Sequence, residues 1–356
     1  MTSLAERLAR RTLELVDIPS ESRREEAIRE RLITLVPAEV PRAAEADEAF
    51  VFAGSRRAGA PLVVLAGHYD TVPAQDNIPG KIADGAVHGL GASDMKGGVA
   101  VALELVRDLA NEPAGPYDVA LLLFGREELS DECNPLPALF AASPFLQDAS
   151  LAVLLEPTDC RLQLGCIGNL NARILFHGVS GHAARPWLAD NAIDRAIAGL
   201  APIAGLERRE TIVGGLPFYE VVTITRLNAG IADNVVPDRA TAHVNLRYAP
   251  DRDPAGAEAY LRSLVPEGAS VELAGNSPAA APATDSPLVD RLRQTGDLEL
   301  GPKQAWTNVA DFAARDIPAV NFGPGATRYA HARDEQVEID ALVRAYEVLR
   351  RFLAAG

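Results

Sequence analysis

The sequence of 356 residues predicts an α/β protein with a smaller α+β domain inserted into it. Short apolar runs at 62–65, 119–124 and 151–155 alternate with helical stretches. Runs that are apolar on both sides are typical of strands buried on both faces, as in a sheet covered by helices. From about residue 171 the pattern changes to strands with partial alternation, and a buried-strand pattern returns at 318–322.

The first part of the chain begins with two predicted helices. Apolar residues between 4 and 16 recur on one face of the first helix. A second helix follows Ser22, whose side chain we expect to cap it together with Glu25, three residues later. A further helix over 97–109 separates two of the buried strands, and this strand–helix–strand order is typical of an α/β domain.

The second part predicts a small domain and a return to the first. Its expected elements are strands at 172–176, 221–225 and 241–248 and a helix at 191–200. Residues 272–287 are rich in Ala, Pro, Ser and Gly and are predicted to be a connection, and 338–353 a closing helix. We therefore predict one domain formed by 1–168 plus 281–356 and an inserted domain over 169–280.

Composition excludes several classes of protein. The chain has 34 Lys and Arg against 49 Asp and Glu, a net charge of −15, which argues against a nucleic-acid partner. The longest apolar runs, such as 61–67, fall far short of the ~20 residues that a membrane span needs. Three cysteines without C-x-x-C spacing argue against a disulfide framework or a thiolate zinc site. No signal peptide is visible at residues 1–11, so we expect a cytoplasmic protein.

Metal-ligating residue types follow every predicted buried strand. His68 and Asp70 follow the strand at 62–65, and Glu127 and Glu128 follow the strand at 119–124. Glu156 follows the strand at 151–155, and His331 follows the strand at 318–322 after a loop. Asp94 lies in a glycine-rich loop before the helix that begins at 97. In open α/β sheets, ligands bind beyond the carboxyl ends of the strands. These side chains are therefore expected at one edge of the sheet.

Imidazole and carboxylate groups without thiolates suit zinc or a similar divalent ion in an open catalytic site. A bridging carboxylate would let two ions share one water. Taken singly, each residue has an ordinary structural explanation: a satisfied polar group at a strand end, a solvated Glu pair, or a tight glycine turn before a helix. The prediction therefore depends on the joint pattern.

Five motifs occur together in order: Gly67–Pro73, Gly91–Gly98, Glu127–Glu128, Gly181–Ala183 and the late His331. They resemble those of the dinuclear zinc deacylases and peptidases, a family that includes succinyl-diaminopimelate desuccinylase, acetylornithine deacetylase, aminoacylase and glutamate carboxypeptidase. The resemblance covers essentially the whole chain. It implies a zinc-exopeptidase-like catalytic domain, in which helices flank a mixed sheet, and an inserted ferredoxin-like dimerisation or lid domain. The stretches 306–312 and 317–325 are most similar to the actinobacterial-type desuccinylases of that family.

The resemblance implies two divalent metal ions, zinc first, with cobalt or manganese as alternatives. It assigns His68, Asp94 and Glu156 to one ion, and Asp94, as the bridge, with Glu128 and His331 to the other. Asp70 would hold the His68 ring through its far nitrogen. Glu127 would be the general base and then the general acid.

The resemblance also implies a homodimer formed through the inserted domain. His182 would reach the active site of the partner subunit and stabilise the oxyanion. Without the resemblance, the sequence around His182 would indicate a surface histidine in a turn. Asn234, Arg247 and Thr307 match substrate-binding positions, and an arginine suits a carboxylate because its planar fork binds both oxygens. His88, His177 and His243 match no ligand position.

The reaction implied is amide hydrolysis of a small N-acyl amino acid, with N-succinyl-L,L-2,6-diaminopimelate as the expected substrate. Another deacylase, similar to acetylornithine deacetylase, and a metallo-carboxypeptidase or dipeptidase remain as alternatives. Two departures from the proteobacterial desuccinylases bear on that choice: Cys166 stands where they have an arginine, and Thr307–Asp311 replaces their Thr-Ser-Asp-Gly-Arg. A non-catalytic metal-binding scaffold is disfavoured because all predicted ligands and the base are present.

Overall fold

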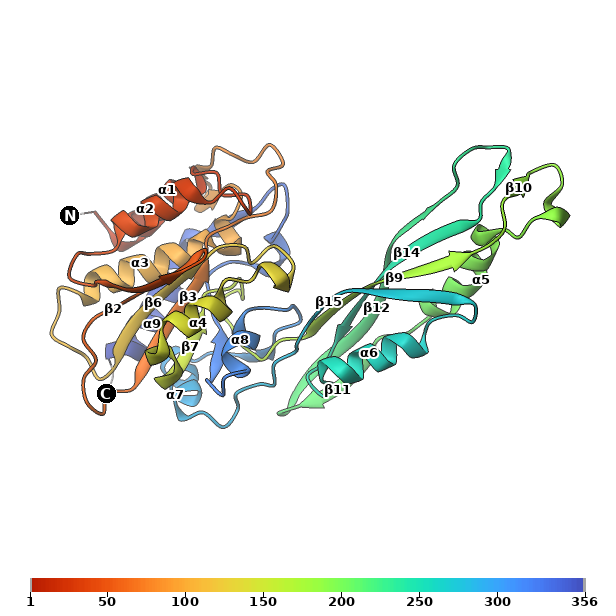
Figure 1. Cartoon of the computed structure of the whole chain (residues 1–356). Coiled ribbons are helices and arrows are strands. Elements are labelled where there is room, and N and C mark those ends of the chain that lie inside the picture. Colours follow the sequence, from red (N-terminus) through yellow and green to blue (C-terminus); the bar gives the residue numbers. More distant parts are fainter. Residues whose placement is uncertain (1, 355–356) are drawn as a thin grey trace. The chain divides into compact units, whose positions relative to one another are not determined.

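The computed structural model describes residues 2–354, and the chain divides into two compact units (Figure 1). The larger unit comprises residues 1–165, 282–301 and 308–356, and the smaller unit comprises 166–281 and 302–307. The first and the last of the described residues both belong to the larger unit. The short segment 302–307 returns to the smaller unit after the main insertion has ended.

A mixed sheet forms the centre of the larger unit. Within residues 2–354 its strand order is β1-β2-β6-β3-β7-β17-β8-β16. The bounds are β1 Arg42–Ala46, β2 Ala49–Ala53, β3 Leu62–His68, β6 Asp118–Phe124, β7 Ala149–Leu154, β8 Leu162–Leu164, β16 Leu300–Pro302 and β17 Ala319–Asn321. The neighbours β6, β3, β7 and β17 run parallel. A small separate sheet contains β4 Lys81–Ala83, β5 Ala86–His88 and β18 Gln336–Glu338.

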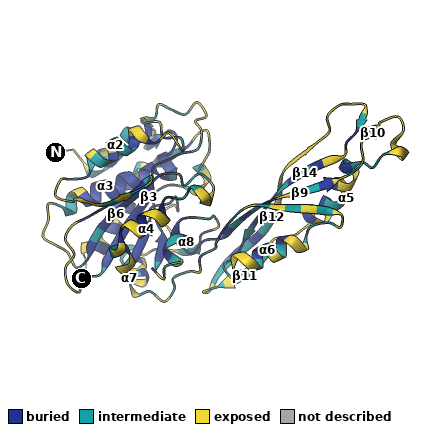
Figure 2. Cartoon of the chain, in the orientation of Figure 1, coloured by how far each residue is buried: buried dark blue, intermediate teal, exposed yellow. Residues whose placement is uncertain are grey.

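Helices cover this sheet. They are α1 Leu4–Val16, α2 Glu26–Leu35, α3 Gly97–Leu109, α4 Leu136–Ala142, α7 Pro287–Gly296, α8 Val309–Ala313 and α9 Ile339–Ala354. Helices α1, α3 and α9 pack against one another. Every residue of β3 is buried, and because successive side chains point to opposite faces, both faces of that strand are covered (Figure 2). The predicted α/β class is confirmed.

The smaller unit is an antiparallel sheet with helices on one face. Its order is β11-β12-β14-β9-β15. The bounds are β9 Gly168–His177, β11 Arg209–Val213, β12 Leu216–Ala229, β14 Arg239–Tyr248 and β15 Ala269–Ser277, with helices α5 Ala192–Ala204 and α6 Pro254–Ser263 and a short pair of β10 Gly181–His182 and β13 Val235–Val236. Alternate residues of β14, from Ala240 to Tyr248, join the core under α5 and α6. The other residues of β14 lie on the face opposite the helices, which we call the open face.

Two local predictions were wrong. Ser22 does not cap α2, which begins at Glu26 without a side-chain cap. Instead, the segment around Ser22 runs beside Thr71, and the Ser22 hydroxyl donates to Asp70. Residues 272–277 are not part of a connection but belong to β15, because pairing with β9 and burial against the core outweigh a composition poor in strand formers.

Two glycines let the backbone approach closely where predicted ligands emerge. A Cβ on Gly98, in the first turn of α3, would lie 2.3 Å from the carbonyl oxygen of Leu155, so α3 packs directly on the backbone that leads to Glu156. Gly91 has φ +79°, and a Cβ there would lie 2.9 Å from Thr71. Glycine is therefore required at both positions. Separately, no helix within residues 2–354 is long and apolar enough to cross a bilayer.

Candidate metal centre

The predicted ligands of the larger unit emerge at the same edge of its sheet. His68 is the last residue of β3, Glu127 and Glu128 follow β6, and Glu156 follows β7. Because β3, β6 and β7 are parallel, their carboxyl ends meet at one edge. The turn Ala92–Lys96, just before α3, contributes Asp94 to the same place.

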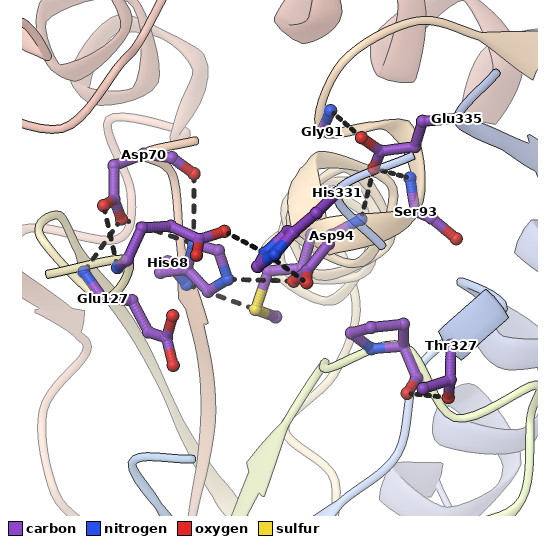
Figure 3. Close-up of polar contacts among 12 residues, drawn as sticks. His68, Asp70, Gly91, Ser93, Asp94, Glu127, Thr327, His331 and Glu335 are labelled. Carbon is purple, nitrogen blue, oxygen red and sulfur yellow. Dashed lines mark hydrogen bonds and ion pairs between the residues drawn. The ribbon is translucent and has the colours of Figure 1, made fainter. Parts of the chain in front are cut away.

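Asp94 lies between two histidines (Figure 3). Its Oδ1 atom is 3.1 Å from Nε2 of His68, and its Oδ2 atom is 3.7 Å from Nε2 of His331. Nε2 of His331 is also 2.9 Å from Oε1 of Glu128. One potential ligand atom from each of His68, Asp94 and Glu128 lies within 4.8 Å of the other two. This is the donor set of a divalent-ion site, with one carboxylate facing both imidazoles.

The electrostatics of this cluster also fit a cation. The pKa of Glu127 lies well above its usual value, and burial is the largest cause. The positive charge of nearby His68 lowers this pKa. The charges of three neighbouring carboxylates raise it: Glu156, Glu128 and Asp94. Hydrogen bonding to Glu128 raises the pKa of His331 to about 9, against the opposing effect of burial. The carboxylates therefore favour additional positive charge, which divalent ions supply.

Asp70 connects the ligand His68 to the paired glutamates. Its Oδ1 lies 3.4 Å from Nδ1 of His68 and accepts the backbone N–H of Glu127 at 3.1 Å. Its Oδ2 accepts the backbone N–H of Glu128 at 3.2 Å and the Ser22 hydroxyl at 2.6 Å. Burial raises the pKa of Asp70, but His68 and these donors lower it to a net value below the usual one. One buried carboxylate thus orients both the imidazole and the turn that carries the two glutamates.

Glu335 anchors the turn that carries Asp94. Its Oε1 accepts the backbone N–H groups of Ser93 and Asp94, at 3.0 and 2.9 Å, and its Oε2 accepts that of Gly91 at 2.9 Å (Figure 3). The residue is buried, and burial raises its pKa to about 7. Neither the role of Glu335 nor the contact between Ser22 and Asp70 was predicted from the sequence. Only the position of Glu335 four residues after His331 could have pointed to it.

The remaining predicted site residues lie in the smaller unit. His182 is exposed at the end of β10, where its Nδ1 accepts the backbone N–H of Ala184 at 3.0 Å. Asn234 lies close to His182 in the fold. Its backbone carbonyl accepts the N–H of Ala183, the residue that follows His182. Arg247 lies on the open face of β14, and Thr307 is buried in the segment 302–307.

The α/β fold and the cluster of histidines and carboxylates at its sheet edge suit a metal-dependent hydrolase. Comparison with known proteins identifies the family: residues 64–355 match the model of peptidase family M20/M25/M40, and the chain belongs to this family. It is therefore an enzyme of a family of metal-dependent hydrolases.

One relative is a protein of Corynebacterium glutamicum named succinyl-diaminopimelate desuccinylase. It is 35% identical over 96% of this chain and 95% of its own length. Among solved structures, the fold is similar to that of aminopeptidase PepT from Bacillus cereus, with a TM-score of 0.76 and 19% identity over 98% of both chains. It is also similar to that of YXEP from Bacillus subtilis, described as a dinuclear metal-binding peptidase, with a TM-score of 0.65 and 16% identity over 98% of this chain and 97% of that one.

Proposed function

We propose that the chain hydrolyses the amide bond of N-succinyl-L,L-2,6-diaminopimelate to succinate and L,L-2,6-diaminopimelate. The observation that best supports a hydrolytic metal site is the position of Asp94 between His68 and His331. The succinylated substrate is supported by the name of the C. glutamicum relative, which matches almost the full length of both chains.

Two divalent ions fit the donor set, and we propose zinc, with cobalt or manganese as alternatives. His68, Glu156 and Asp94 would hold one ion, and Asp94, Glu128 and His331 the other. When bound, the ions would supply an activated water and a Lewis acid for the amide carbonyl. Asp70 would keep His68 oriented with its Nε2 toward the cluster, because its carboxylate faces Nδ1 of the same ring.

Glu127 is proposed as the proton carrier. It would take a proton from the attacking water and pass it to the nitrogen of the leaving amine, so that the carboxyl returns to its starting state. Burial raises the pKa of Glu127 above that of an exposed glutamate; nearby His68 lowers this pKa, and the charges of Glu156, Glu128 and Asp94 raise it. Its neighbour Glu128, committed to a metal, could not perform this role.

The smaller unit would supply recognition of the substrate. Arg247 would bind a substrate carboxylate with its planar guanidinium, and Asn234 and Thr307 would contact the substrate through polar groups. His182 would stabilise the oxyanion in the active site of a partner subunit, in a homodimer formed through the smaller unit. A cytoplasmic location remains a prediction.

A substrate panel tests the reaction. Zinc-loaded protein is assayed with N-succinyl-L,L-diaminopimelate, N-acetyl-L-ornithine and a dipeptide, each beside a chelator-treated control, and kcat/KM is compared. We expect chelator-sensitive release of succinate with the highest kcat/KM. Preference for acetylornithine or the dipeptide would assign the chain to another activity of the family, and hydrolysis of no compound would favour the non-catalytic scaffold.

A further inference from the structure

Three asparagines and Arg247 form a polar network on the open face of the smaller unit. Asn245, two residues before Arg247 on β14, accepts a hydrogen bond from Nε of Arg247 at 3.0 Å through its Oδ1. Its Nδ2 donates to Oδ1 of Asn169 at 2.7 Å and to Oδ1 of Asn171 at 2.8 Å. The strand register explains these contacts, because Asn171 lies opposite Asn245, and Asn169 opposite Arg247.

The chemistry of the network permits one orientation of the central amide. A guanidinium only donates hydrogen bonds, so Asn245 must turn its oxygen toward Arg247 and its NH₂ group toward β9. There, Asn169 and Asn171 both present oxygens to that NH₂ group. Two β9 side chains thus hold one amide, and that amide accepts the Nε–H of Arg247.

The charge of the open face suits an anionic ligand. One row along from this network, His243 on β14 lies opposite Arg173 of β9 and Arg226 of β12. Burial lowers the pKa of His243, and the charges of Arg226 and Arg173 lower it further. Glu272 of β15 lies opposite Arg173 at the end of the row. Arg173, Arg226 and Arg247 therefore outnumber the one acidic residue named in these three rows, Glu272, in a chain whose net charge is −15.

We propose that Asn245 is a positioning residue that holds the guanidinium of Arg247 in a fixed plane for a substrate carboxylate, and that Asn169 and Asn171 orient Asn245 for this purpose. The proposal deepens the proposed function and rests on the assignment of Arg247 to substrate binding. Fixing Arg247 before the substrate arrives would lower the entropy lost on binding. The ligand class it implies is a substrate that carries at least one carboxylate remote from the scissile amide.

A double-mutant cycle tests the proposal. The variants are Asn245→Ala, Arg247→Ala and the double variant, with kcat and KM measured on the succinylated substrate and folding checked by thermal melting. Because a hydrogen bond to a charged group is lost, we expect Asn245→Ala to lower kcat/KM about 10- to 100-fold, mainly through KM. In the Arg247→Ala background the same change should have little further effect. Asn228→Ala, an exposed asparagine on β12, is the matched control and should leave kcat/KM unchanged.

Equal losses in both backgrounds would overturn the proposal, because Asn245 would then act independently of Arg247. A second measurement does not depend on the substrate: the Arg247 Nε–H signal in ¹⁵N NMR, assigned by its loss in Arg247→Lys. We expect protection of this proton from solvent exchange in the wild type and faster exchange in Asn245→Ala. Unchanged exchange would refute the positioning role. Failure of the wild type to cleave the succinylated compound would refute only the proposed function.

Discussion

Glu335 holds the turn that carries Asp94, a ligand of the proposed metal site. Its two carboxylate oxygens accept three backbone N–H groups from the turn that carries Asp94. Asp94 itself faces both histidines. A shift of that turn would therefore alter the coordination of both proposed ions at once.

The change Glu335→Gln should weaken metal binding. Glutamine has one accepting oxygen, so its NH₂ group would have to face at least one of the N–H groups of Gly91, Ser93 and Asp94. We expect the zinc affinity, measured by competition with a chromophoric chelator, to fall about 10- to 100-fold. The control is Glu338→Gln, at the exposed end of β18. Equal zinc affinity in wild type and Glu335→Gln would contradict the anchoring role.

The residues that could be predicted from sequence are those with a local signal. His68, Glu128 and Glu156 directly follow apolar runs, and the sheet topology then brings them to one edge. Glu335 has no such signal, because the groups it binds lie more than 240 positions earlier in the chain. Ser22 was misread because serine near a helix start has an ordinary capping role. Only tertiary contact with Asp70 distinguishes its actual role.

The strands and helices were predictable where burial dominates. The helix expected over 97–109 matches α3, and the strands at 62–65, 119–124 and 151–155 match β3, β6 and β7 in position. β15 was missed because its residues form a strand only through pairing with β9. Asn134 and Asp311 lie far apart in the sequence and were not expected to meet. The side-chain amide of Asn134 donates to both carboxylate oxygens of Asp311 at 3.0 Å.

The ion-pair cluster around Glu220 should make the stability of the smaller unit depend on pH. This buried β12 carboxylate receives two hydrogen bonds each from Arg209 and Arg252. Burial raises the pKa of Glu220, but the arginines lower it to a net value below its usual 4.5. A folded-state pKa below the unfolded value adds stability above pH 4.5, which is lost as the pH falls through the lower folded pKa.

The change Glu220→Gln should remove this contribution. We expect a loss of about 1–3 kcal/mol in the free energy of unfolding at pH 7, and a smaller loss of stability on acidification than in the wild type. Urea unfolding between pH 7 and 3 measures both quantities. Glu258→Gln, which breaks a more exposed pair on α6, should change stability little. A Glu220→Gln variant that loses stability with acid as steeply as the wild type would contradict this explanation.

The division of the whole chain into two units separates the proposed metal ligands from the proposed substrate-binding residues. His182, Asn234, Arg247 and Thr307 belong to the smaller unit, and the histidines and carboxylates of the metal cluster belong to the larger one. A role of His182 in the partner subunit's active site makes a prediction about mixed dimers. His182→Ala and Glu127→Ala should each be inactive as homodimers.

Mixing the two variants and allowing the subunits to exchange should restore activity. In the mixed dimer, one site would combine Glu127 of the His182→Ala chain with His182 of the Glu127→Ala chain, so that site would be complete. We expect activity approaching that of one site per mixed dimer. If His182 acts within its own chain, no mixed dimer has a complete site, and activity would stay at the level of the separate variants.

In the proposed mechanism, a metal centre at the sheet edge hydrolyses the amide, with Glu127 as the base. The most direct test is to load wild type and Glu127→Ala with zinc, count the bound ions, and measure succinate release by both. We predict equal metal content and a loss of turnover of about 100- to 10,000-fold in the variant. Turnover at the wild-type rate would contradict the role of Glu127, and metal-free wild type that releases succinate equally fast would contradict the metal mechanism itself.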